Sequence, residues 1–258
     1  MRFLLTNDDG INSLGLHVLK EALTPFGEVF VFAPAGEMSA VGHSITLNRP
    51  LRVVGHRDRE YAVHGTPTDC VVLAVHHFLR DNPPGVVFSG INHGANLGAD
   101  VTYSGTVAAA MEGLIMGIPS VAVSLAGESR DVKHFETARA FVEHLVKNLC
   151  WESFPREVLL NINVPDIPLC DVKGLKVVHL GARRYADVVS EGVDAQGNIY
   201  YTIGGTVVSC GDGEDTDTWA IEQGYATITP IHLDLTARRA FKWLYRQEDI
   251  LGGFCEGL

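Results

Sequence analysis

The 258-residue chain lacks the patterns that mark several common classes of protein. Its five cysteines are scattered and form no Cys-x-x-Cys pair, which favours free thiols over a disulfide or zinc framework. No apolar run approaches the roughly 20 residues that a membrane helix needs, and no basic segment followed by an apolar one opens the chain. We therefore expect a cytoplasmic protein with no membrane partner.

Basic side chains are also in short supply. The chain has 20 Lys and Arg residues against 31 Asp and Glu residues, which gives a formal net charge of −11. Nucleic-acid polymers and anionic membranes attract basic surfaces, so this balance disfavours both partners. A small anionic substrate remains compatible with it, because a bound metal ion or a helix N-terminus can reverse the local field.

Several catalytic motifs are missing as well. The sequence has no Walker A lysine motif, no Gly-x-Gly-x-x-Gly after its first strand and no Gly-x-Ser-x-Gly elbow. These absences disfavour a P-loop, a dinucleotide site and an acyl hydrolase. A glycosidase is disfavoured too, because Asp8 and Asp9 are too close in sequence to flank a glycosidic bond in the usual way.

What the chain does contain is an alternation of apolar strands and amphipathic helices. A strand at residues 3–6, helical spacing at 14–23 and a strand at 29–33 form one βαβ unit, typical of an α/β protein with a parallel sheet. Further strands or extended segments are predicted at 44–47, 51–54, 61–63, 86–88, 118–124, 159–164, 177–180, 199–203 and 225–229. Helices are predicted after residue 66, after residue 104, and at 135–149, 218–223 and 237–246.

Two adjacent carboxylates follow the first strand, in the segment Asn7-Asp8-Asp9-Gly10. Like charges held in an enclosed site repel each other and lose hydration, and a bound cation would relieve that cost. The same four residues also suit a polar turn. This segment alone leaves both interpretations open.

Two more polar segments follow strands and carry oxygen ligands, Ser39 at residues 35–43 and Asn92 at residues 89–98. In open parallel sheets, ligands bind outside the carboxyl ends of the strands, so the fold would bring these segments to the two carboxylates. Carboxylate, hydroxyl and amide oxygens suit Mg²⁺, Mn²⁺ or Ca²⁺, and suit zinc poorly. The sequence therefore indicates an all-oxygen cation site.

A helix start at Ser104-Gly105-Thr106 offers N–H groups and two hydroxyls to an anion. Serine is also a preferred helix N-cap, so an ordinary cap is the alternative. Three other polar features receive structural interpretations: His43 and His93 as solvated or backbone-bonded side chains, and the acidic run at residues 212–217 as a solvated loop.

Several separated motifs, in order along nearly the whole chain, resemble those of the SurE (survival protein E) family. They are Thr6-Asn7-Asp8-Asp9-Gly10, Gly42-His43-Ser44-Ile45-Thr46, Gly65-Thr66-Pro67-Thr68-Asp69, Ser89-Gly90-Ile91-Asn92-His93-Gly94-Ala95-Asn96-Leu97-Gly98, Tyr103-Ser104-Gly105-Thr106-Val107 and Thr216-Asp217. The resemblance implies a Rossmann-like three-layer α/β sandwich with a mainly parallel sheet.

It also implies an activity. Members of the family are metal-dependent 5′/3′-nucleotidases, which hydrolyse nucleoside monophosphates, and some also act on polyphosphate. Carried onto this sequence, the resemblance makes four residues the ligands of one divalent cation per subunit: Asp8, Asp9, Ser39 and Asn92. It places four more around the phosphate: Asn96, Ser104, Gly105 and Thr106. We expect Asp9 to orient or deprotonate the water, with an aspartyl-phosphate on Asp8 as the alternative.

The resemblance further implies how the chain is organised. Residues 1–130 would form the core with the metal site, and residues 131–258 would complete that core and add an extended β-hairpin and a closing helix. In the family this hairpin is exchanged between subunits, so a homodimer or homotetramer is expected.

A second class of function stays open: a metal- and nucleotide-binding regulatory module whose phosphatase activity is incidental. Two carboxylates, an anion site and a glycine-lined cleft are more than binding requires, which favours the enzyme. Turnover of AMP and GMP separates the two interpretations, because a module would hold its nucleotide without hydrolysing it.

Overall fold

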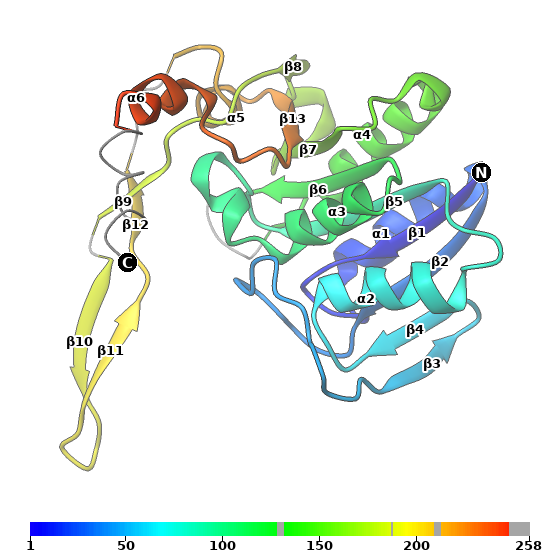
Figure 1. Ribbon diagram of the computed structural model, residues 1–258, viewed down its shortest axis with the longest axis horizontal. Helices are drawn as coiled ribbons and strands as arrows, with labels where there is room; N and C mark the ends of the chain where they lie inside the picture. Colours follow the sequence, from blue (N-terminus) through cyan, green and yellow to red (C-terminus); the bar gives the residue numbers. More distant parts are fainter. Residues whose placement is uncertain (128–131, 187, 209–212, 248–258) are drawn as a thin grey trace, which may run out of the picture.

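A computed structural model describes residues 1–127, 132–186, 188–208 and 213–247 and has a three-layer α/β architecture (Figure 1). The strands of its central sheet are β1 (Arg2–Thr6), β2 (Glu28–Pro34), β3 (Val53–Arg57), β4 (Glu60–Val63), β5 (Val86–His93), β6 (Ser120–Ala126), β7 (Val158–Pro165), β8 (Leu175–Val177) and β13 (Ala226–His232). This nine-stranded sheet has the order β3-β4-β2-β1-β5-β6-β7-β13-β8. The run from β4 to β7 is parallel, which confirms the predicted α/β class.

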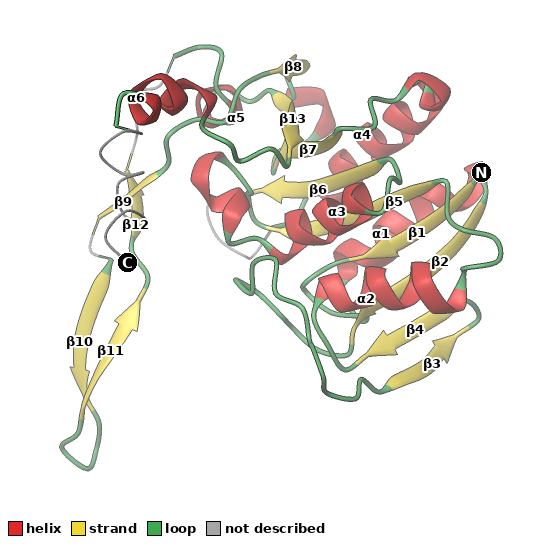
Figure 2. Cartoon of the chain, viewed as in Figure 1, coloured by secondary structure: helices red, strands yellow, loops and turns green. Residues whose placement is uncertain are grey.

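Helices cover both faces of the sheet (Figure 2). The helices α1 (Leu14–Leu23) and α4 (Phe135–Asn148) contact each other, as do α2 (Pro67–Leu73) and α3 (Gly105–Ile115). Alternate side chains of β1 face the two layers: Phe3 and Leu5 pack in the core cluster that includes α1 and α4, and Leu4 packs in the cluster that includes α2. Two-sided burial explains why the central strands are apolar almost throughout.

The small residues of α3 allow it to lie close to the sheet. A methyl group added at Gly113 would lie 2.4 Å from Ser120 Oγ and 2.9 Å from Val87 Cγ2. Neither distance is a tolerable contact, so glycine is required for this approach. The close packing brings the N-terminus of α3 to the carboxyl ends of β1 and β5.

Two of the predicted extended segments differ in the structure. Strand β5 continues to His93, so Asn92 lies on a strand rather than in a loop. Residues 44–47, in contrast, form no strand. There the backbone N–H and the hydroxyl of Thr46 donate to the Asp69 carboxylate, at 2.8 and 2.7 Å, so a side chain takes the place of a neighbouring strand.

Asp217 contradicts the interpretation of the acidic run as a solvated loop. It begins the short helix α5 (Asp217–Glu222) and is fully buried. Its carboxylate accepts hydrogen bonds from the backbone N–H groups of Gly98, Gly181 and Thr218, at 2.9, 2.7 and 2.8 Å. Burial raises the pKa of Asp217, and these N–H groups oppose that rise. Residues 213–215 are exposed, and Asp212 lies outside the described residues.

An antiparallel arm projects from the body of the molecule (Figure 1). In it β9 (Arg184–Ala186) pairs with β12 (Thr206–Val208), and β10 (Val189–Val193) pairs with β11 (Ile199–Ile203). The arm is the expected C-terminal hairpin, although only residues 199–203 were predicted to be strand. The division at residue 130 stays a prediction, and β7 and β13 lie within the central sheet.

The last helix of the described residues is α6 (Phe241–Tyr245), which is shorter than the helix predicted at 237–246. Three cysteines are free thiols, as expected: Cys70, Cys150 and Cys170. Cys210 and Cys255 lie outside the described residues. Within the described ranges, no helix combines the length and the apolar character needed to cross a membrane.

Gly15 gives a direct test of the packing of α1 on β5. A methyl group at this position would lie 1.9 Å from the carbonyl oxygen of Ile91. We expect Gly15→Ala to lower the free energy of unfolding by about 2–3 kcal/mol, as overpacked cores do. Gly55→Ala is the control, because its methyl group would meet no heavy atom within 4 Å. Urea unfolding of both variants checks this, and equal midpoints would contradict it.

Candidate functional site

The topology of the sheet places the candidate site. The chain passes from β1 to β2 on one side and later reaches β5 on the other side of β1. Ligands of open α/β sheets bind at such a switch point, outside the carboxyl ends of the strands. Asp8 and Asp9 directly follow β1, and Asn92 lies near the end of β5.

Asp8 lies against the start of α3. The residue is 4% exposed, and its carboxylate accepts two hydrogen bonds from Thr106, one from the backbone N–H at 3.1 Å and one from the hydroxyl. A methyl group at Gly105 would lie 2.8 Å from Asp8 Cβ. Gly105 therefore lets the helix start approach the carboxylate, and Thr106 fixes the carboxylate there.

This environment penalises the charged form of Asp8. Burial raises the pKa of its carboxyl from 3.8 to about 6, and the adjacent Asp9 charge adds to the rise, while the Thr106 hydrogen bonds oppose it. A divalent cation would reverse the balance by favouring the ionised carboxylate. The pair of acids is thus a fitting partner for a cation.

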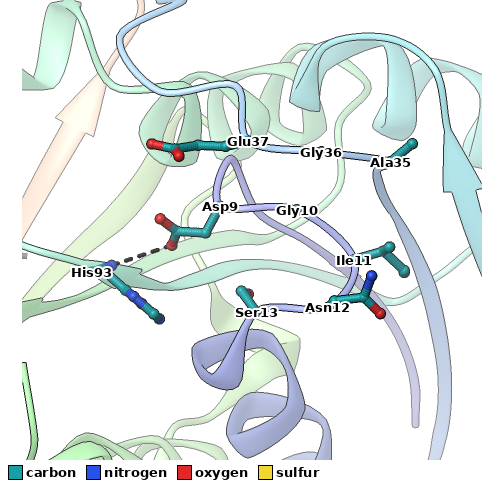
Figure 3. Close-up of a pocket in the computed structure, with 9 residues that line it drawn as sticks. All are labelled: Asp9, Gly10, Ile11, Asn12, Ser13, Ala35, Gly36, Glu37 and His93. Atoms are coloured by element: carbon teal, nitrogen blue, oxygen red, sulfur yellow. Dashed lines mark hydrogen bonds between the residues drawn. The ribbon is translucent and has the colours of Figure 1, made fainter.

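Asp9 joins the ends of β1 and β5. Its Oδ2 accepts a hydrogen bond from the backbone N–H of His93 at 3.2 Å, and Figure 3 shows the carboxylate turned toward that strand. The His93 ring packs against Phe135, with ring centroids 4.9 Å apart. His43 instead bonds Glu112 at 2.9 Å. His43 thus pairs with a carboxylate rather than with the backbone, and the buried Nε2 of His93 has no hydrogen-bond partner among the described residues, so neither matches the expected solvated or backbone-bonded side chain.

Ser39 comes from the segment after β2. Its hydroxyl donates to Glu37 Oε1 at 2.8 Å, and the N–H of neighbouring Met38 donates to the carbonyl oxygen of Asp8 at 2.7 Å. That backbone bond docks the Ser39 segment onto the carboxylate segment. Glu37 was not predicted from the sequence, where the available signal was a third acid two positions before Ser39.

Asn92 and Asn96 have side chains that are already oriented by the protein. Asn92 Nδ2 donates to the carbonyl oxygen of Gly94 at 2.9 Å, and Asn96 Nδ2 donates to Ser124 Oγ at 2.8 Å. In both residues the amide nitrogen is thus used as a donor within the protein. The carbonyl oxygen of Asn92 is the group suited to a cation.

Ser104 is the N-cap of α3, the alternative stated for it. Its hydroxyl oxygen accepts from the N–H of Val107 at 3.1 Å. Thr106 uses its N–H and hydroxyl on Asp8. A role around a phosphate stays a prediction for Asn96, Ser104, Gly105 and Thr106.

A cleft of about 460 Å³ opens beside Asp9. Figure 3 shows the residues that line it, which are Asp9, Gly10, Ile11, Asn12, Ser13, Ala35, Gly36, Glu37 and His93. The cleft thus lies between the segments that follow β1 and β2 and the end of β5. This places solvent-accessible space for a small molecule next to the proposed cation ligand.

The donor set is of mixed type. Among the described residues, no group of three or more His, Cys, Asp or Glu side chains is placed to hold a metal ion. A cation at Asp8 and Asp9 would therefore draw on neutral oxygens such as those of Ser39 and Asn92. Hard cations accept such ligands, and the set lacks the imidazole and thiolate that zinc prefers.

Comparisons with known proteins agree with this architecture. A crystal structure of the SurE protein from Aquifex aeolicus superposes with a TM-score of 0.86 at 42% sequence identity, and covers 96% of this chain and all of that one. A protein of Aeromonas hydrophila named 5′-nucleotidase SurE is 48% identical over 98% of this chain and its own full length. A protein of Alkaliphilus metalliredigens with the same name is 44% identical over 95% of this chain and 97% of its own.

The family described as survival protein SurE matches residues 3–187. This range holds both carboxylates, the Ser39 segment, β5 and the start of α3. The chain belongs to the SurE family.

Proposed function

We propose that this protein is a 5′-nucleotidase, a phosphoric monoester hydrolase that splits nucleoside monophosphates into nucleoside and phosphate. The observation that carries the proposal is the buried Asp8 carboxylate, which lies beside Asp9 at the switch point of the sheet. The relatives from Aeromonas hydrophila and Alkaliphilus metalliredigens match this chain over nearly their full length, and both are named 5′-nucleotidase SurE. The 3′-nucleotidase and polyphosphatase activities stay predictions.

One divalent cation per subunit, Mg²⁺, Mn²⁺ or Ca²⁺, belongs to this proposal. Asp8 and Asp9 would supply charge, and Ser39 and Asn92 would supply neutral oxygens. When bound, such a cation neutralises charge on the phosphoryl group and lowers the pKa of a water molecule. The raised pKa of Asp8 supports the proposal, because it shows that the hydrogen bonds within the protein do not fully offset the cost of burying the charged carboxylate.

The two carboxylates have different tasks in this proposal. Both oxygens of Asp8 are hydrogen-bonded to Thr106, which suits an anchoring carboxylate and disfavours Asp8 as a nucleophile. Asp9 lines the cleft and holds one oxygen against the His93 N–H. Asp9 is therefore the better candidate to orient the attacking water and receive its proton.

The start of α3 would hold the phosphate. Ser104 accepts a hydrogen bond from Val107 and so keeps its own hydroxyl proton to donate to a phosphate oxygen. The helix dipole and the N–H of Gly105 would add to this attraction. Thr106 would contribute mainly by holding Asp8, because its N–H and hydroxyl are already donated to that carboxylate.

A homodimer or homotetramer is the proposed assembly. The arm and α6 carry many large apolar side chains that are exposed in one subunit: Val189, Val193, Ile199, Tyr200, Tyr201, Ile203, Trp243 and Tyr245. Exposed apolar surface of this extent marks an interaction site. The cytoplasmic location expected from the sequence stays a prediction.

A regulatory module that binds a metal and a nucleotide is the second candidate. It would use the same carboxylates and the same helix start, so turnover of the nucleotide is the property that distinguishes it from the enzyme. Steady-state assays on AMP, GMP and a generic phosphoester separate the two. Nucleotide that binds tightly and is recovered intact would support the module and overturn the enzyme.

Asp8→Asn should abolish cation-dependent release of phosphate from AMP, because the variant loses the buried anchoring charge. The fold should persist, since an amide of the same size fills the same space. Phosphate release with Mg²⁺, measured with and without EDTA, checks this, and EDTA should stop the wild-type reaction. Asp58→Asn, at a side chain that is 97% exposed, is the control. An Asp8→Asn variant with near wild-type activity would show that the site assignment is wrong.

The raised pKa of Asp8 predicts how the metal-free protein responds to pH. The Asp8 carboxyl has a pKa of about 6 in the folded protein, against 3.8 for an ordinary aspartate, so its protonation stabilises the folded state. This stabilisation is fully present below pH 4 and is lost as pH rises through 6. The loss should reach about 3 kcal/mol. The free energy of unfolding of wild type and of Asp8→Asn is measured in EDTA from pH 4 to 7. The difference between the two proteins should fall as pH rises, and a difference that does not change with pH would refute the prediction.

The exposed arm predicts an assembled protein in solution. Light scattering after size exclusion should give a mass of two or four times the 28.0 kDa of one chain. Tyr201→Glu, on the exposed face of β11, should shift the mass toward one chain, because it places a charge in the apolar contact. Wild-type protein that elutes with the mass of one chain would contradict this prediction.

A further inference from the structure

Two asparagines of β7 lie deep in the sheet with no role in the site described above. Asn161 and Asn163 are both fully buried, and they alternate along the strand with the buried Ile162. An amide taken out of water costs free energy unless it is hydrogen-bonded. Apolar side chains could be buried in the sheet without this desolvation cost. The hydrogen-bond partners of the two amides should therefore explain why asparagine occupies these positions.

Their partner is the backbone of Asn96, in the segment that follows β5. Asn163 binds both backbone groups of this residue: its Oδ1 accepts from the Asn96 N–H at 2.8 Å, and its Nδ2 donates to the Asn96 carbonyl oxygen at 3.0 Å. Asn161 Nδ2 donates to the same carbonyl oxygen at 2.8 Å. The Asn163 amide therefore pairs with Asn96 as a neighbouring strand would.

The register of the sheet connects this contact to the cation site. Asn92 on β5, Ser124 on β6 and Asn163 on β7 are aligned in one row across three adjacent strands. Ser124 accepts from Asn96 Nδ2, so the segment after β5 crosses the end of β6 and is fastened to β7. That segment begins at Gly94, directly after β5, and the Asn92 amide near the end of β5 donates to the Gly94 carbonyl oxygen.

We propose that Asn163, assisted by Asn161, is a positioning residue for the reaction. It fixes the backbone of Asn96, two residues after the Gly94 carbonyl that binds Asn92, so that the Asn92 carbonyl faces the cation and Asn96 faces the phosphate. This inference rests on the proposed function. It assigns to β7, three strands away from β1 in the sheet order, a share in shaping the site that follows β1.

The test replaces Asn163 with leucine, which keeps the branched shape and removes both hydrogen bonds. Groups that orient metal ligands typically contribute about 10- to 100-fold to metal affinity or activity. We expect Asn163→Leu to weaken Mn²⁺ binding, measured by calorimetry, and to lower kcat/KM for AMP within that range. Raising the Mn²⁺ concentration should restore part of the activity of Asn163→Leu at a temperature where the metal-free variant is fully folded, so that stabilisation by the metal does not account for the recovery.

Thr229→Val is the matched control. Thr229 is 3% exposed on the adjacent strand β13, in register with Asn161, and its hydroxyl has no hydrogen-bond partner among the described residues. This variant should stay within twofold of wild type in Mn²⁺ affinity and in kcat/KM. Asn161→Leu, which removes a smaller part of the anchor, should change both quantities in the same direction as Asn163→Leu but less.

The outcomes separate the two proposals. A folded Asn163→Leu variant within twofold of wild type in both quantities overturns the positioning role and leaves the nucleotidase intact. If Asn163→Leu does not fold, the same measurements on Asn161→Leu test the positioning role, and values within twofold of wild type overturn it. A wild-type protein that neither binds Mn²⁺ nor hydrolyses AMP overturns the proposed function, and the positioning role with it.

Discussion

The contact between the Asp8 carboxylate and the start of α3 is the constraint on which the rest of the site depends. Thr106 holds both carboxylate oxygens, and Gly105 leaves room for the approach. α3 can come so near because Gly113 lets it lie on the sheet. The result is a carboxyl group whose ionised form is disfavoured by burial, which is the physical basis of the proposed cation site.

Around this contact, the polar segments are held by side chains from distant parts of the sequence. Asp217 binds the N–H of Gly98, Asn163 binds the backbone of Asn96, and Asp69 binds Thr46. Each anchor is buried, and in each case a side chain supplies hydrogen bonds that a strand or helix would otherwise supply. This supports loops of irregular shape at the edge of a regular sheet.

The sequence predicted elements whose apolar pattern faces the core, and the bounds of the helix at 14–23 match the structure. In the exposed arm it predicted only the strand at 199–203, whose β-branched and aromatic residues favour a strand even though all five are exposed. The strands β9, β10 and β12 were missed, because the arm has no core of its own and its side chains are largely exposed. Asp217 was misjudged because nothing in an acidic run tells which carboxylate turns inward.

By itself the sequence determined the α/β class, the two carboxylates after β1 and the oxygen-rich segments after β2 and β5, because hydrophobic period and motif position are local properties. Only the tertiary structure decided that Thr106 binds Asp8, that Ser104 caps α3 and that β7 reaches Asn96. Those contacts join residues far apart in the chain, or assign a polar group one of several partners. Side-chain hydrogen bonds depend on distance and direction in space, which residue order does not specify.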